Sequence, residues 1–134
     1  MPTVVIGDPF PGSKEALERA VVGAFETHYH GPPTRFAIRT AADPRIRHRL
    51  VLMFDPPRAL SASALCGDTA SLAAPQSDDA SRVLAALCER GLIYSEATAA
   101  GPVPASPGDP ALGAMIGAVL MALLPSMDPF EDLD

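Results

Sequence analysis

The segment from Ala111 to Leu124 most constrains the fold of this chain, because none of its 14 side chains is charged or carries a hydroxyl group. A membrane-spanning helix needs about 20 apolar residues, so this segment is too short to cross a bilayer and predicts a helix buried in a protein core. Asp109 can accept hydrogen bonds from the free N–H groups of the first turn, and Pro110 suits the first helical position. Pro125 ends the segment.

Two glycines mark one side of this helix. Gly113 and Gly117 are four residues apart and therefore lie on the same face. The spacing predicts that a strand or a second helix packs closely against the backbone there. The alternative is a self-association surface, because the same spacing occurs at dimer interfaces of membrane helices.

The length of the chain bounds its organisation. Its 134 residues are enough for one hydrophobic core but not for two. We therefore predict a single domain, residues 1–126, followed by an acidic C-terminal tail, residues 127–134. The 15 prolines and 10 glycines predict long irregular connections.

The net charge of −6 is unevenly distributed along the chain. Six arginines and two aspartates lie between Arg35 and Arg58, a local charge of +4, whereas residues 59–134 hold ten acidic residues and two arginines. A protein that neutralises phosphates is usually basic overall, and this acidic chain has no tryptophan for base stacking. We therefore expect no nucleic-acid binding.

The first half of the chain contains strand and helix patterns. The β-branched run at residues 3–6 predicts a strand. Ser13 is a suitable N-cap for a helix whose apolar positions, from Leu17 to His28, recur with helical spacing on one face. Residues 35–40 and 47–54 predict two further strands, and because a short turn joins them we expect them to pair antiparallel.

The second half leaves one segment ambiguous. Residues 56–81 predict a long loop, part of which, at residues 62–66, should be tied to the core, because long structureless connections are uncommon. A helix at 77–90 gives a ferredoxin-like βαββαβ order followed by the C-terminal helix. A strand at 82–90 that turns through the three-residue loop Glu89-Arg90-Gly91 into residues 92–98 gives a helix followed by a four-strand antiparallel meander. Both are α+β folds in which the last helix covers the sheet.

Six short motifs are spread along the chain. They are Gly12-Ser13 at the start of an amphipathic helix, Arg35-Phe36, Arg49 to Pro56, Leu65-Cys66, Leu87-Cys88 and Leu123-Leu124-Pro125. Together they resemble a group of small bacterial envelope proteins, often lipoproteins, of uncharacterised function. The resemblance covers most of the chain and rests on structural motifs, so it implies no active site.

The resemblance implies a Cys66–Cys88 disulfide and a strand before the second cysteine, whereas the residues alone leave the two cysteines as either a reduced pair or a disulfide. We therefore predict the meander, covered by an N-terminal amphipathic helix and a C-terminal apolar helix.

The arginines are the main candidates for a binding surface. Arg35, Arg39, Arg47 and Arg49 would share one face of the two strands and could clamp an acidic protein partner or an anionic ligand. The other interpretation is that they only keep an exposed sheet face soluble.

The histidines and cysteines come nearest to a metal site. His28 and His30, with His48, Cys66 and Cys88 elsewhere, are zinc-ligand types, but they lack the paired spacing of zinc sites. We predict no metal site, no cofactor and no catalytic residue.

These observations favour a noncatalytic binding or accessory module, a monomer or weak homodimer without a transmembrane segment. The alternative is a metal-binding or thiol-dependent enzyme that uses His28, His30 and the cysteines. The start of the sequence carries neither a signal-peptide pattern nor a cysteine that could be acylated. We therefore expect a periplasmic or envelope protein if a leader has been removed, and a cytoplasmic protein if the sequence is complete as given.

Overall fold

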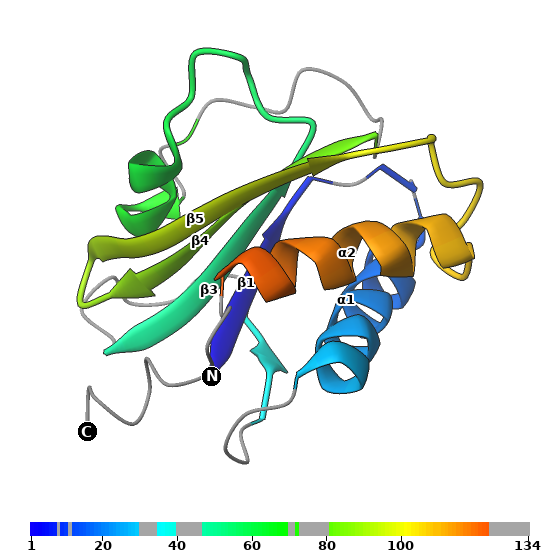
Figure 1. Cartoon of the computed structure of the whole chain (residues 1–134), viewed down its shortest axis with the longest axis horizontal. Helices are drawn as coiled ribbons and strands as arrows, with labels where there is room; N and C mark the ends of the chain where they lie inside the picture. Colours follow the sequence, from blue (N-terminus) through cyan, green and yellow to red (C-terminus); the bar gives the residue numbers. More distant parts are fainter. Residues whose placement is uncertain are drawn as a thin grey trace.

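Five apolar and β-branched segments form one mixed β-sheet (Figure 1). The computed structural model describes residues 1–7, 9–10, 12–29, 35–39, 47–69, 72 and 81–123. The strands are β1 (Pro2–Ile6), β2 (Ala37–Ile38), β3 (His48–Phe54), β4 (Arg82–Glu89) and β5 (Leu92–Ala100), in the order β2-β1-β3-β4-β5. The helices are α1 (Lys14–His28), α2 (Pro110–Leu123) and the short 3-10 helix η1 (Ala62–Cys66). The predicted α+β class, with one helix near each end, is confirmed.

The pairing of the N-terminal strands differs from the prediction. The antiparallel pairing expected between residues 35–40 and 47–54 is wrong, because β1 lies between β2 and β3 and is parallel to both. Thr3 faces Ile38 on one side and Leu50 on the other. The cause is α1, which crosses back over the sheet after β1 and so lets β2 start from the same end as β1.

The last three strands of the predicted four-strand meander are confirmed. β3, β4 and β5 are consecutive antiparallel neighbours, so residues 82–89 are a strand and not the helix of the ferredoxin-like alternative. Arg90 and Gly91 have positive φ angles of 52° and 85°, as a two-residue type I′ hairpin turn requires. The turn therefore has two residues, and Glu89 already pairs with Leu92.

One face of the sheet is covered by α1 and α2 (Figure 1). Leu17, Val21 and Phe25 of α1 are fully buried, which confirms the apolar face predicted from their spacing. α2 buries seven of its 14 residues, so the prediction of a core helix is confirmed as well. The buried sheet residues of this layer are Val5, Leu50, Leu52, Phe54, Val83, Ala85, Leu87 and Ala97.

The opposite face of the sheet is covered by η1. Leu65 and Cys66 are fully buried there with Val51 and Met53 of β3. Residues 62–66 of the long loop are therefore anchored to the core, as predicted. Because β3 and β4 are buried on both faces, their sequences are continuously apolar and not alternating.

Asp109 begins α2 as its position in the sequence predicts. Its Oδ1 accepts a hydrogen bond of 2.9 Å from the N–H of Ala111, and its Oδ2 accepts one of 2.9 Å from the N–H of Ala105. These two bonds stabilise the carboxylate and lower the pKa of Asp109 below its usual value. The same side chain thus links the first turn of α2 to the preceding loop.

The remaining predictions concern membrane spans and domain organisation. No helix among the described residues is long and apolar enough to span a membrane. The acidic tail, residues 127–134, and the domain boundary expected at residue 126 lie outside the described residues. The described residues themselves form a single domain around one sheet.

α1 approaches α2 closely at Gly117. A Cβ atom at this position would lie 2.6 Å from Cδ2 and Nε2 of His28, whereas a Cβ atom at Gly113 would meet nothing within 4 Å. The close approach that the glycine spacing predicts is therefore confirmed at Gly117 and not at Gly113.

This difference predicts opposite effects for two identical substitutions. Gly117→Ala should lower the free energy of unfolding by about 1 kcal/mol, because the new methyl group displaces the His28 ring. Gly113→Ala should leave stability unchanged or raise it by up to about 1 kcal/mol, because alanine has the higher helix propensity. Urea denaturation of both variants measures the effect, and His28→Ala should relieve the loss in Gly117→Ala. Equal stability of the two glycine variants would contradict the assignment.

Candidate functional site

The four candidate arginines do not form one binding face. Arg49 is fully buried, while Arg35, Arg39 and Arg47 are exposed. Arg35 and Arg39 flank β2 at one edge of the sheet, and Arg47 precedes β3, with β1 between the two strands. The two-stranded ribbon on which all four would point outward is therefore not present, and Arg49 is not available to a ligand.

Arg49 acts inside the protein. It lies opposite Cys88 in the register of β3 and β4, and its Nη2 donates hydrogen bonds to the carbonyl oxygens of Cys66 and Gly67, the latter at 3.0 Å. These carbonyls are at the C-terminal end of η1, where a guanidinium group is favourably placed. The buried charge therefore holds η1 against the sheet.

The sequence pattern around Arg49 does not predict that its side chain is buried. A strand that alternates at its start, Arg47-His48-Arg49, indicates an exposed side. The only sequence signal against exposure is the continuous apolar run from Leu50 to Phe54, which is typical of a strand covered on both faces.

The two cysteines are bonded to each other. Cys66 and Cys88 form a disulfide across 22 residues of sequence, and both are fully buried. The disulfide joins η1 to β4 next to the carbonyls that Arg49 binds. Neither sulfur is a free thiol in this form.

The histidines are placed apart. The ring of His28 packs against α2 at Gly117, His48 begins β3, and His30 lies outside the described residues. In the described part of the chain, no group of three or more histidine, cysteine, aspartate or glutamate side chains could hold a metal ion.

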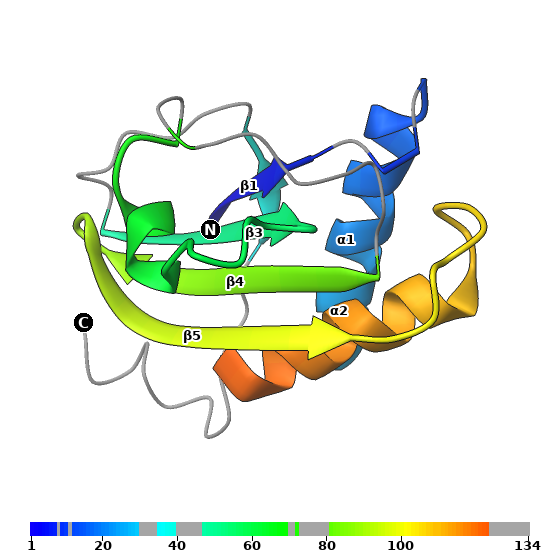
Figure 2. The ribbon, with the colours of Figure 1, turned by 90° about the horizontal axis from the view of Figure 1, so that it is seen from above.

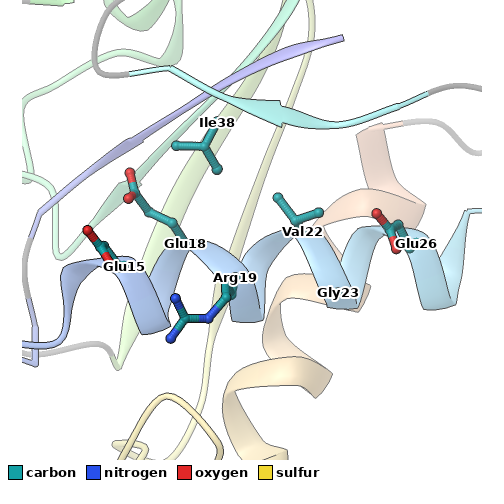
Figure 3. Close-up of a pocket in the computed structure, with 7 residues that line it drawn as sticks. All are labelled: Glu15, Glu18, Arg19, Val22, Gly23, Glu26 and Ile38. Carbon is teal, nitrogen blue, oxygen red and sulfur yellow. The ribbon is translucent and has the colours of Figure 1, made fainter.

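An open groove runs along α1 beside β2 (Figure 3). Its volume is about 520 Å³, and Val22 and Ile38 supply its apolar part. Figure 3 shows Glu18 on the side of α1 that faces Ile38, and Arg19 pointing away from that strand. The lining residues are Glu15, Glu18, Arg19, Val22, Gly23, Glu26 and Ile38. Three carboxylates and one guanidinium make this groove acidic, so its charge is opposite to that of the anion site expected from the arginines.

The outer edge of β5 is the second accessible feature. Figure 2 shows β5 along the rim of the sheet, and no described strand pairs with it on that side. Leu92, Ile93 and Tyr94 at its start are 74%, 37% and 45% exposed, which is unusual for three consecutive large apolar residues in a small domain.

The main chain of β5 also faces outward at alternate residues. The N–H of Gly101 donates to the carbonyl of Ser81 at 2.9 Å, on the β4 side. Because N–H and C=O groups alternate between the two sides of an antiparallel strand, those of Glu96, Thr98 and Ala100 point away from β4. β5 therefore presents a row of hydrogen-bonding groups next to an exposed apolar tip.

The sequence contained part of this signal. The sequence predicts a strand at residues 92–98, and the structure confirms it as part of β5. The strand pattern does not show that β5 lies at the edge of the sheet or that its first three residues are exposed.

Comparisons of the chain with protein families, with curated proteins and with solved structures found no match.

The buried guanidinium leads to a stability prediction. Arg49→Met should lower the free energy of unfolding by about 2–4 kcal/mol, because the carbonyls of Cys66 and Gly67 lose their donor. Amide exchange in residues 62–67 should rise at the same time. Arg58→Met, at an exposed arginine, is the matched control and should change stability by less than about 0.5 kcal/mol. A loss of the same size in both variants would show that burial of Arg49 is not the cause.

The disulfide leads to a second prediction. Replacing both cysteines by alanine should lower the free energy of unfolding by about 3 kcal/mol, because the cross-link restricts the unfolded chain across 22 residues. Chemical denaturation of the double variant, and of the native chain with and without reductant, measures the loss. In intact-mass measurements under denaturing conditions, reduction should add the mass of two hydrogen atoms. An unchanged mass would show that the pair is not oxidised.

Proposed function

We propose that this chain is a noncatalytic protein-binding module, an accessory protein that binds an extended polypeptide segment along the outer edge of β5. The observation that carries the proposal is this edge, a strand of nine residues whose outer side no described strand occupies. An added strand gains main-chain hydrogen bonds along such an edge.

The apolar tip of β5 supports the same proposal. An exposed edge strand promotes unwanted pairing, and natural proteins usually protect it with charged side chains or proline. β5 has one charged residue, Glu96, and starts with the exposed Leu92, Ile93 and Tyr94. Aromatic and aliphatic side chains of this kind supply most of the energy of protein interfaces.

The acidic groove along α1 supports a binding function less directly. Its carboxylates can attract a basic segment, but they are exposed or half-buried, and exposed ion pairs contribute little affinity. The β5 edge adds directional hydrogen bonds to apolar contact, and for this reason we assign the function to it.

The alternative, a metal-binding or thiol-dependent enzyme, has less support. A thiol nucleophile or ligand needs a free sulfur, and Cys66 and Cys88 are joined in a disulfide. His28, the one described histidine of that hypothesis, is used in packing against α2.

The disulfide also supports a proposal for the compartment. Disulfides persist in oxidising compartments such as the bacterial periplasm. Together with the resemblance to small bacterial envelope proteins, this supports an exported accessory protein of the envelope.

Selection from a displayed library of random peptides, with the full chain as bait, tests the binding function. Selected peptides should shift the amide resonances of residues 95–101 and not those of α1. Thr98→Pro should weaken their binding at least tenfold, because proline removes the outward N–H group.

Thr98→Val is the matched control, since it keeps the N–H group and nearly the same shape, and it should bind the peptides normally. Circular dichroism establishes that both variants are folded. Peptides that bind Thr98→Pro as well as the native chain would refute the proposal.

A further inference from the structure

The regular part of β5 is symmetric about Thr98. The register with β4 is interrupted between Leu87 and Cys88, opposite Tyr94, and is then unbroken from Ser95 onward. The pairing continues to Gly101, and Pro102, which has no N–H group, follows. The irregularity at Tyr94 and the proline at 102 are each four residues from Thr98.

This symmetry matters for pairing with a second copy. When two copies of β5 pair antiparallel about Thr98, residue 96 of one copy faces residue 100 of the other. Glu96 then faces Ala100 and never another Glu96, so no like charges meet. Thr98 faces Thr98, a cross-strand pair that favours sheet pairing. The remaining pairs are Ser95 with Gly101 and Ala97 with Ala99. Their side chains are small, so they do not hinder the approach of the two strands.

The segment from β5 to α2 is nearly uncharged. The chain has 16 acidic and 10 basic residues, yet between Leu92 and Leu123 only Glu96 and Asp109 are charged. This segment therefore contributes only −2 of the net charge of −6, and two copies can meet at β5 with little electrostatic repulsion. α2 packs on β5, and its exposed residues include the uncharged Ala118, Met121 and Ala122.

We infer that the segment bound at the β5 edge is β5 of a second copy, in a homodimer whose two-fold axis passes through Thr98 and whose sheet is continuous across both copies. This inference rests on the proposed function of the edge and names its partner. The outward N–H and C=O groups of Glu96, Thr98 and Ala100 form the hydrogen bonds between the copies.

A single introduced cysteine tests the register. The two Thr98 Cα atoms would lie about 5.5 Å apart as a hydrogen-bonded antiparallel pair, within the range of a disulfide. Thr98→Cys should therefore form a covalent dimer under mild oxidation, seen on a non-reducing gel. Ala100→Cys is the matched control. Its two Cα atoms would be about 14 Å apart, so it should not cross-link alone but should cross-link when mixed with Glu96→Cys.

Light scattering of the native chain and of Thr98→Pro completes the test. The native chain should have twice the mass of 13.9 kDa, and Thr98→Pro should be a monomer. A monomeric native chain whose selected peptides still bind at β5 would overturn the self-pairing and leave the binding function intact. A monomer that binds no peptide would overturn both. A dimer in which Ala100→Cys cross-links as readily as Thr98→Cys would place the contact elsewhere and overturn the inference.

Discussion

Burial of β3 and β4 on both faces is the constraint on which the other elements depend. Two central strands that are apolar on both sides require a cover on each side. Two α-helices supply one cover, and they are long enough to bring their own apolar faces. The other cover is η1, five residues long, which has too little apolar surface to stay in place by packing alone.

The small cover explains why a charge and a disulfide lie in the core. Arg49 satisfies the carbonyls of Cys66 and Gly67, which would otherwise be left without a donor when η1 is pressed against the sheet. The disulfide attaches the same residue, Cys66, to β4. Cys66 is thus held both through its backbone and through its side chain. These two attachments fix η1 against the sheet, where it covers one side of the core.

The strand order also determines where a partner can bind. β1 lies inside the sheet, between β2 and β3, and separates the arginines around β2 from those around β3. β5 lies outside, and its first residues extend beyond the cover of α2 and η1, so large apolar side chains reach solvent. The binding edge follows from topology, since β5 is the last strand in the order and no described strand pairs with its outer main-chain groups.

Much of the fold could be predicted from local patterns. The apolar run at 111–124, the spacing of Leu17, Val21 and Phe25, and the positions of β3 and β5 are visible in the sequence, because helix and strand periods and capping residues act over a few neighbouring positions. Propensity alone did not identify the strand at 82–89, since leucine and alanine fit a helix equally well. The prediction of a strand rested on the resemblance, which implies a strand before Cys88.

Only the tertiary structure decided four features of the protein. These are the order of the strands, the burial of Arg49, the close approach of α1 at Gly117 and not at Gly113, and the exposure of β5. Each depends on contacts between residues far apart in the chain. A local sequence pattern describes the side chain and its immediate neighbours, but not the elements that pack against it.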